Sequence, residues 1–311
     1  MREPSKSGRL GLVQELLLWA PALMAFCLLC DKASWFWVNV PEMQFGWAIP
    51  LLGGYLIWER WLDRGVRVEK WGVASVGLMF LGCASIFVTQ IYQAAYGLTA
   101  ASMSGVGLGF LLIGLANASY IHGFAGIRQF WFGFAFLLLA IPIPSIIYER
   151  IVGTLQNSVA WMTVELLALY GIPAQLQGSL VQLPSCTVGV NEACSGIRSL
   201  QSTLMASLFI GSLTLKWWFA QIALLVFGLL LAIIGNLVRV FYLSVSASRE
   251  GVEVLDSVHD TAGWSILLFT IVGVVLLSWI LGKIEQWVIT VSPGVVGLKS
   301  PVGGDVQGKR V

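Results

Sequence analysis

Residues 219–246 decide the fold of this chain, and they read FAQIALLVFGLLLAIIGNLVRVFYLSVS. Arg239 is the single charged residue in this segment. A helix of about 20 predominantly apolar residues is long enough to cross the ~30 Å hydrocarbon core of a bilayer. The segment is therefore predicted to be a transmembrane helix that carries one arginine inside it.

The rest of the chain has a similar composition. Of its 311 residues, 57% are hydrophobic and 11% are charged, whereas about 25% of the residues are charged in soluble domains. The formal net charge is only +2, and no Lys/Arg-rich run with interleaved aromatic residues is present, which excludes nucleic acid as a partner. This composition predicts an all-α polytopic membrane protein surrounded by the lipid bilayer.

Eight apolar stretches are long enough to be spans, and together they predict one polytopic transmembrane domain over residues 1–291. The glycines of the fourth stretch, including Gly105 and Gly109, suit close helix–helix contact. The tail 292–311 is predicted to be disordered and cytoplasmic. A basic N-terminus precedes the first stretch, as in a signal peptide, but the lack of a clean small-x-small cleavage site favours an uncleaved span. The eight predicted spans are 12–30, 45–62, 72–93, 103–120, 130–147, 194–214, 219–246 and 262–282.

The distribution of lysine and arginine predicts how these spans are oriented, because cytoplasmic segments of membrane proteins are enriched in both. With the N-terminus inside, thirteen of the 18 Lys and Arg residues lie on the cytoplasmic side and three on the other, while Arg198 and Arg239 fall within spans. Both termini are therefore predicted to be cytoplasmic. The same orientation places Cys194, Arg239 and His259 on the extracytoplasmic side.

The longest region outside the spans, residues 148–193, separates the fifth and sixth spans on the extracytoplasmic side. Residues 151–169 combine helical apolar spacing with polar Asn157 and Glu165, which predicts an amphipathic interfacial helix. Residues 179–190 contain short alternating pieces that predict a small β-hairpin.

Cys194 lies where a polar loop turns into the sixth stretch, and it is one of five cysteines. Ser195 and Gly196 follow it, which indicates an accessible backbone at the start of a helix. A helix N-terminus and a nearby cation both stabilise a thiolate, and Arg198 is four residues further along, on the same helix face. The pattern supports a nucleophilic cysteine, with a buried structural thiol as the alternative. Whether Cys186 is free or paired stays open.

Arg239 is the second candidate. An arginine in the hydrocarbon costs roughly 2.5–3.5 kcal/mol on insertion scales, so it normally faces the interior of the helix bundle. Asn236, one turn earlier, shares its face. A cation at this position would stabilise a thiolate or an oxyanion. The alternatives are snorkelling to the interface, a transporter whose substrate path contains Arg239 and Asn236, and an assembly factor without chemistry.

His259 lies at the mouth of the eighth stretch and is one of two histidines in the chain. As a general base or acid it would have to come within hydrogen-bond reach of Cys194. Asp256, three residues earlier, could orient the imidazole on a helix. Glu192 is a candidate for contact with substrate or with an arginine. Exposed loop residues are the alternative for His259 and Glu192, and no motif predicts a metal or a cofactor.

The run Glu192-Ala193-Cys194-Ser195-Gly196-Ile197-Arg198-Ser199-Leu200, then Asn236-x-x-Arg239, then His259 followed by Gly263-Trp264, resembles the exosortase/archaeosortase family. The similarity in order, spacing and membrane setting extends over residues 130–270. Archaeal relatives generally have arginine in the third place, so His259 indicates the bacterial exosortase branch.

The resemblance implies a membrane-embedded cysteine protease or transpeptidase of the cytoplasmic (inner) membrane. Family members act on exported, membrane-anchored proteins with a C-terminal sorting signal, which consists of a short PEP-CTERM-like motif, a hydrophobic helix and a basic end. The resemblance makes Cys194 the nucleophile, Arg239 the conserved cation and His259 the third catalytic residue. It implies cleavage through a thioacyl intermediate, followed by hydrolysis or by transfer to an acceptor. The exosortase subfamily and the oligomeric state are not indicated.

Overall fold

The computed structural model describes residues 12–62, 72–184, 186–189, 196–251 and 253–291, and residues 253–262 are described as helical backbone. These ranges form helices and one small sheet. In chain order the elements are α1 (Leu12–Asn39), the 3-10 helix η1 (Pro41–Trp47), α2 (Ile49–Leu62), α3 (Val73–Tyr96), α4 (Ala100–His122), α5 (Phe124–Leu137), the 3-10 helix η2 (Leu138–Ala140), α6 (Ser145–Leu169), β1 (Gln175–Gln177), β2 (Leu180–Gln182), β3 (Thr187–Gly189), α7 (Ile197–Thr214), α8 (Trp218–Glu250) and α9 (Glu253–Val291).

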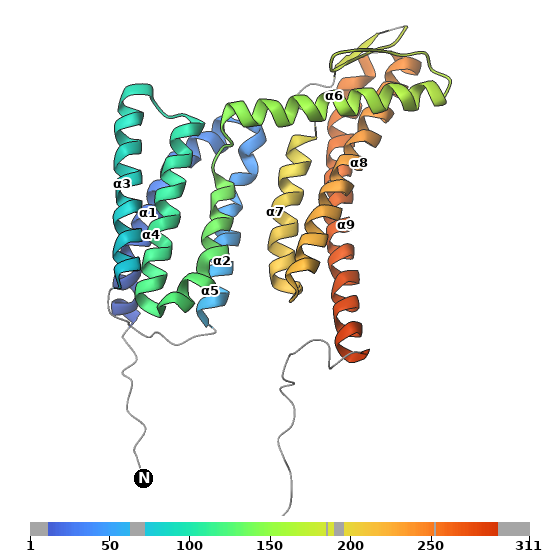
Figure 1. Ribbon diagram of the computed structural model, residues 1–311. Helices are drawn as coiled ribbons and strands as arrows, with labels where there is room; N and C mark the ends of the chain where they lie inside the picture. Colours follow the sequence, from blue (N-terminus) through green and yellow to red (C-terminus); the bar gives the residue numbers. More distant parts are fainter. Residues whose placement is uncertain (1–11, 63–71, 185, 190–195, 252, 292–311) are drawn as a thin grey trace, which may run out of the picture.

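Apart from α6, the α-helices of the described ranges stand upright in alternating directions, and α6 runs across the upper end of the molecule from α5 toward α8 (Figure 1). The first upright helix begins, and the last one ends, at the lower end of the molecule (Figure 1). By length and composition, five of the described helices could cross a membrane, or six if α5 and α6 count as one bent span. Because α2 and α5 have 14 residues each, they are only about 21 Å long. The all-helical architecture is thus confirmed, and the number of eight crossings stays a prediction.

Two predicted spans contain a break. The predicted span 130–147 overlaps α5, which ends at Leu137, and after η2 the chain turns by 78° into α6. Pro142 and Pro144 lie in this turn, where they cannot donate backbone hydrogen bonds and disfavour helix in the residue before them. The predicted span 45–62 likewise begins inside η1, and its α-helix starts only at Ile49.

The helix predicted over residues 151–169 is confirmed as part of α6. Its buried residues Val152, Val159, Ala160, Thr163 and Leu167 recur at helical spacing, so they form one face. Asn157 and Glu165 are exposed. The buried face packs against α8 and the sheet, which fixes α6 across the upper end of the upright helices.

The hairpin predicted within residues 179–190 is confirmed as the antiparallel pair β2–β3, and β1 extends it to a three-stranded antiparallel sheet in the order β1-β2-β3. Val181 of the central strand pairs with Leu176 on one side and Val188 on the other. Val181 and Val188 are buried in a cluster with Leu243 and Ala247 of α8. The sheet therefore covers the upper end of α8.

Helices α3 and α4 approach each other closely at two glycines, as the sequence predicted for the fourth stretch. A methyl group added to Gly109 would lie 3.0 Å from the carbonyl oxygen of Gly82, and one added to Gly82 would lie 3.0 Å from the carbonyl oxygen of Gly109. Any larger side chain at either position would have to push the two backbones apart.

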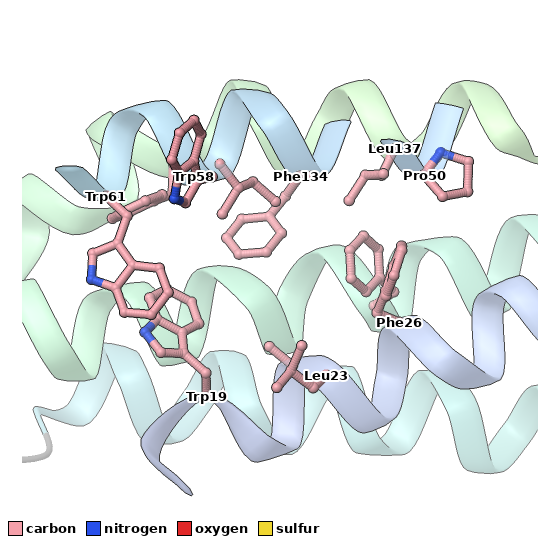
Figure 2. A pocket seen from close by; sticks show the side chains of 13 residues that line it. Trp19, Leu23, Phe26, Pro50, Trp58, Trp61, Phe134 and Leu137 are labelled. Atoms are coloured by element: carbon pink, nitrogen blue, oxygen red, sulfur yellow. The ribbon is translucent and has the colours of Figure 1, made fainter. Parts of the chain in front are cut away.

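An apolar groove of about 260 Å³ lies between α1 and α2. Figure 2 shows Trp19, Leu23 and Phe26 of α1 facing Trp58 and Trp61 of α2 across it. Its lining is almost entirely apolar.

Candidate active site

Arg239 lies in α8 about three turns before the end of that helix, and its side chain is half-buried. Its guanidinium lies against the backbone of α9, since a methyl group added to Gly263 would be 3.2 Å from Nη2 and 3.5 Å from Cζ. His259 lies four residues before Gly263 on the same helix, and positions four apart share a helix face. The predicted cation thus contacts α9 one turn away from the predicted histidine.

Gly196, the residue just before α7, packs against Asn236 of α8. It precedes α7 with φ +77° and ψ 5°, a left-handed conformation that glycine adopts without a Cβ clash. A methyl group there would lie 2.6 Å from Cγ of Asn236, and Asn236 is buried at 3% exposure. Glycine is therefore required twice at this position, by the backbone conformation and by the neighbouring amide.

Arg198, in the first turn of α7, forms an ion pair with a residue that the sequence did not predict. Its Nη2 lies 3.3 Å from Oε1 of Glu42 in η1, with side-chain exposures of 51% for Arg198 and 12% for Glu42. The pair joins the N-terminal helices to α7 across 156 positions of sequence. In the sequence, Glu42 stands out only as a carboxylate that directly follows Pro41 between two apolar stretches.

These residues line one cleft of about 470 Å³ at the upper end of the molecule, between η1, α7, α8 and α9. Its volume lies within the range of about 300–1,000 Å³ that is typical of ligand sites. Among the described lining residues the charged ones are Glu42, Arg198 and Arg239, which leaves a net positive charge suited to an anion. The other lining residues are Pro41, Gln44, Phe45, Gly196, Ser199, Ser202, Asn236, Gly263, Trp264, Ile266 and Leu267.

The structure brings three of the predicted site residues, Arg198, Asn236 and Arg239, into this cleft. Asp256 and His259 lie on the described backbone of α9, one to two turns before Gly263. The remaining predicted residues, Glu192, Cys194 and Ser195, lie outside the described residues. Arg198 was expected to stabilise a thiolate, and the structure pairs it with Glu42 instead.

Comparison with known protein families supports one assignment. A family model described as transmembrane exosortase (Exosortase_EpsH) matches residues 37–277, a range that begins before η1, ends within α9 and includes every described residue that lines the cleft. Searches of curated proteins and of solved structures gave no match. Because the family model covers most of the sequence, this multi-pass membrane protein belongs to the transmembrane exosortase family.

Proposed function

We propose that this exosortase is a membrane-embedded cysteine protease or transpeptidase that cleaves the PEP-CTERM-like C-terminal sorting signal of exported proteins. Exosortases are in general cysteine transpeptidases that sort membrane proteins. The observation that carries the proposal is the double contact of α8 in the cleft, where Asn236 meets Gly196 and Arg239 meets Gly263. Those two glycines follow the proposed nucleophile Cys194 and the proposed acid–base His259 in the sequence.

Chain connectivity supports the meeting of these groups. Two residues of extended chain span at most about 7 Å, so Cys194 is tethered close to Gly196 and thus to the buried amide of Asn236. His259 is tethered to Gly263 by one turn of α9, which is about 6 Å of helix rise. The cleft between these two tethers contains the guanidinium of Arg239 and is large enough for a segment of polypeptide.

The chemistry is acyl transfer. The thiolate of Cys194 attacks the carbonyl carbon of the scissile peptide bond and produces a tetrahedral oxyanion, which the Arg239 guanidinium stabilises by charge-assisted hydrogen bonding. Collapse of this intermediate breaks the C–N bond, and the departing amine takes a proton from His259. The N-terminal part of the substrate remains on Cys194 as a thioester. Water or an acceptor amine then attacks the thioester, gives its proton to His259 and releases the Cys194 thiolate.

The orientation follows from the charge distribution and the direction of the helices. The enrichment of lysine and arginine supports cytoplasmic termini. Residues of η1 and of the start of α7 line the cleft, and these two elements lie at the end of the upright helices opposite to the start of α1 and the end of α9 (Figure 1). The proposed active site therefore faces the exterior of the inner membrane. A substrate anchored there by its own helix would be confined to two dimensions, which raises its effective concentration.

The test is processing of a tagged membrane-anchored reporter in membranes that contain the full-length enzyme. We expect Cys194→Ala to abolish processing while the variant accumulates in the membrane like the parent. Cys83→Ala is the matched control, because Cys83 is exposed on α3, and it should process normally. Continued cleavage by Cys194→Ala would rule out the proposed nucleophile, whereas a parent enzyme that processes no reporter would favour a transporter using Arg239 and Asn236.

A further inference from the structure

A second cavity lies beside the cleft, on the other side of η1. It has a volume of about 220 Å³ and is formed by η1, α4, the turn between α5 and α6, and α7. Phe45 lines both this cavity and the cleft. Gln201 of α7 lines the cavity, and the next residue, Ser202, lines the cleft. The two spaces are thus neighbours that share one wall, and we call the second one the η1 cavity.

The η1 cavity has apolar walls and one polar group without a partner. Met43, Leu139, Pro142 and Leu204 are among its lining residues, and none of the described lining residues is charged. Gln201 is 8% exposed, and its Oε1 atom is shielded from solvent and accepts no hydrogen bond from the described part of the chain. A buried amide oxygen in that state costs free energy until a donor reaches it.

The other polar side chain of the η1 cavity differs from Gln201. Ser104 donates a hydrogen bond of 3.2 Å from its Oγ to the backbone oxygen of Ala100, so its donor is already used within its own helix. Gln201 is therefore the group through which the cavity would recognise a ligand, after a rotation of its side chain that turns the shielded Oε1 atom toward the cavity. Its amide offers both acceptor and donor atoms.

This chemistry fits a polypeptide better than a lipid headgroup. A peptide group carries one donor and one acceptor and pairs well with an amide side chain, and apolar walls suit an apolar side chain beside it. A phosphate headgroup would need a cation, which the described lining does not supply. We infer that the η1 cavity is a specificity subsite that accepts an apolar side chain of the substrate near the scissile bond, with the Gln201 amide hydrogen-bonded to the adjoining peptide group. This inference rests on the proposed function.

The test uses the full-length enzyme in membranes and a panel of anchored reporters. In each reporter, one of the residues that flank the cleavage position is replaced by alanine. With the parent enzyme, we expect at least one alanine reporter to be processed about tenfold more slowly or worse, because one apolar side chain is lost from a pocket. Leu204→Trp fills the cavity, so it should slow the unchanged reporter about tenfold and abolish the difference between that reporter and the sensitive alanine reporter.

A milder variant probes the hydrogen bond. Gln201→Leu should slow processing about threefold to tenfold, the size expected for one hydrogen bond, through KM more than through kcat. Ser207→Ala is the matched control, since Ser207 lies on the same helix and carries a buried hydroxyl that, like the amide oxygen of Gln201, has no partner among the described residues. It lies outside the residues that line the cavity and should leave processing and reporter preference unchanged.

A third measurement covers the case in which Leu204→Trp does not accumulate in the membrane. A photo-cross-linking residue at Leu139, combined with Cys194→Ala, should capture the reporter, whereas the same probe at the exposed Phe80 of α3 should not. Unchanged reporter preferences in the cavity variants, or equal capture at both positions, would overturn the subsite. Failure of the parent enzyme to process any reporter would instead contradict the proposed function, so the two failures are distinguishable.

Discussion

Polar side chains at the two ends of helices α7, α8 and α9 have different surroundings: Glu285 and Ser278 are buried and hydrogen-bonded at the lower end, and polar side chains line a cleft at the upper end. At the lower end, Glu285 is 4% exposed, and its carboxylate accepts hydrogen bonds from the backbone N–H groups of Lys216 at 3.1 Å and Trp217 at 2.9 Å. It thereby satisfies donors at the start of α8 that have no partner within the helix. Nearby, Thr214 and Ser278 share a hydrogen bond of 2.7 Å.

At the upper end, the same three helices part around a cleft of about 470 Å³. There Arg198 keeps 51% of its side chain exposed despite its ion pair with Glu42, and Arg239 lies against Gly263 beside open space. A buried charge whose partners are all backbone groups stabilises the fold, whereas charges that line a cleft remain available to a ligand. From this difference we propose that the Glu285 carboxylate is structural and that the Arg239 guanidinium is functional.

The largest effect is expected for Arg239→Gln, which removes the cation from the cleft. Loss of one group that stabilises an oxyanion typically lowers kcat by about 10²–10³-fold, and processing of the reporter should fall by that factor while the protein still accumulates. Arg249→Gln is the matched control on the same helix. Its guanidinium is exposed and contacts the Tyr170 hydroxyl at 3.1 Å, so its processing should change less than about twofold. Equal losses of processing in both variants would contradict a specific role for Arg239 in the cleft.

Gly196→Ala should have the next largest effect. The new methyl group would meet Asn236 at 2.6 Å in a backbone conformation of φ +77°, and the resulting shift should lower processing by at least about tenfold. Gly171→Ala is the control, because Gly171 has φ +81° and a methyl group added there would have no atom within 4 Å. Both variants carry the backbone strain, of order 1–2 kcal/mol, and only the first one disturbs the cleft. Thermal unfolding in detergent measures the shared part, and the processing rate measures the difference.

A smaller effect, on stability alone, is expected for Glu285→Gln at the lower end. The neutral amide is a weaker acceptor for two backbone donors, which should lower the free energy of unfolding by about 1–2 kcal/mol. Processing per folded molecule should be unchanged. Glu165→Gln, at an exposed position of α6, should leave the unfolding temperature unchanged. A loss of processing by folded Glu285→Gln protein would contradict a purely structural role for this carboxylate.

The smallest effect is expected for Glu42→Gln. Because Arg198 is half exposed, the ion pair should contribute less than about 1 kcal/mol to stability, and processing should change less than about threefold. The change should shrink further as the salt concentration rises, since salt screens exposed charges. A tenfold or larger loss of processing that persists in high salt would show that Glu42 takes part in the reaction and does more than anchor η1.

The helical architecture could be predicted from the sequence because a long apolar run directly predicts a long helix. The helical apolar spacing of residues 151–169 likewise predicted the helix that the structure shows within α6. Hydropathy did not locate the turn after Leu137, because Pro142 and Pro144 lie in a run that is as apolar as the helix before it. Only backbone chemistry, the lack of an N–H donor in proline, ends the helix there.

The site was predictable only in part. Asn236 and Arg239 were predicted to share a face of one helix, and both line the cleft. Such a prediction needs only the helical period. Glu42 and Gln201 were not predicted, because their roles depend on which helices become neighbours. Arg198 and Glu42 are 156 positions apart, and no local pattern encodes that distance.

The most direct measurement of the central claim is mass spectrometry of the enzyme caught during turnover. Full-length protein in membranes is mixed with the anchored reporter and quenched in acid, and the cysteine-containing peptides are analysed before and after treatment with hydroxylamine. The account predicts that the N-terminal part of the reporter is attached to Cys194 through a hydroxylamine-sensitive thioester, and that Arg239→Gln reduces this adduct strongly. An adduct on a different residue, or complete processing with no thioester at Cys194, would contradict it.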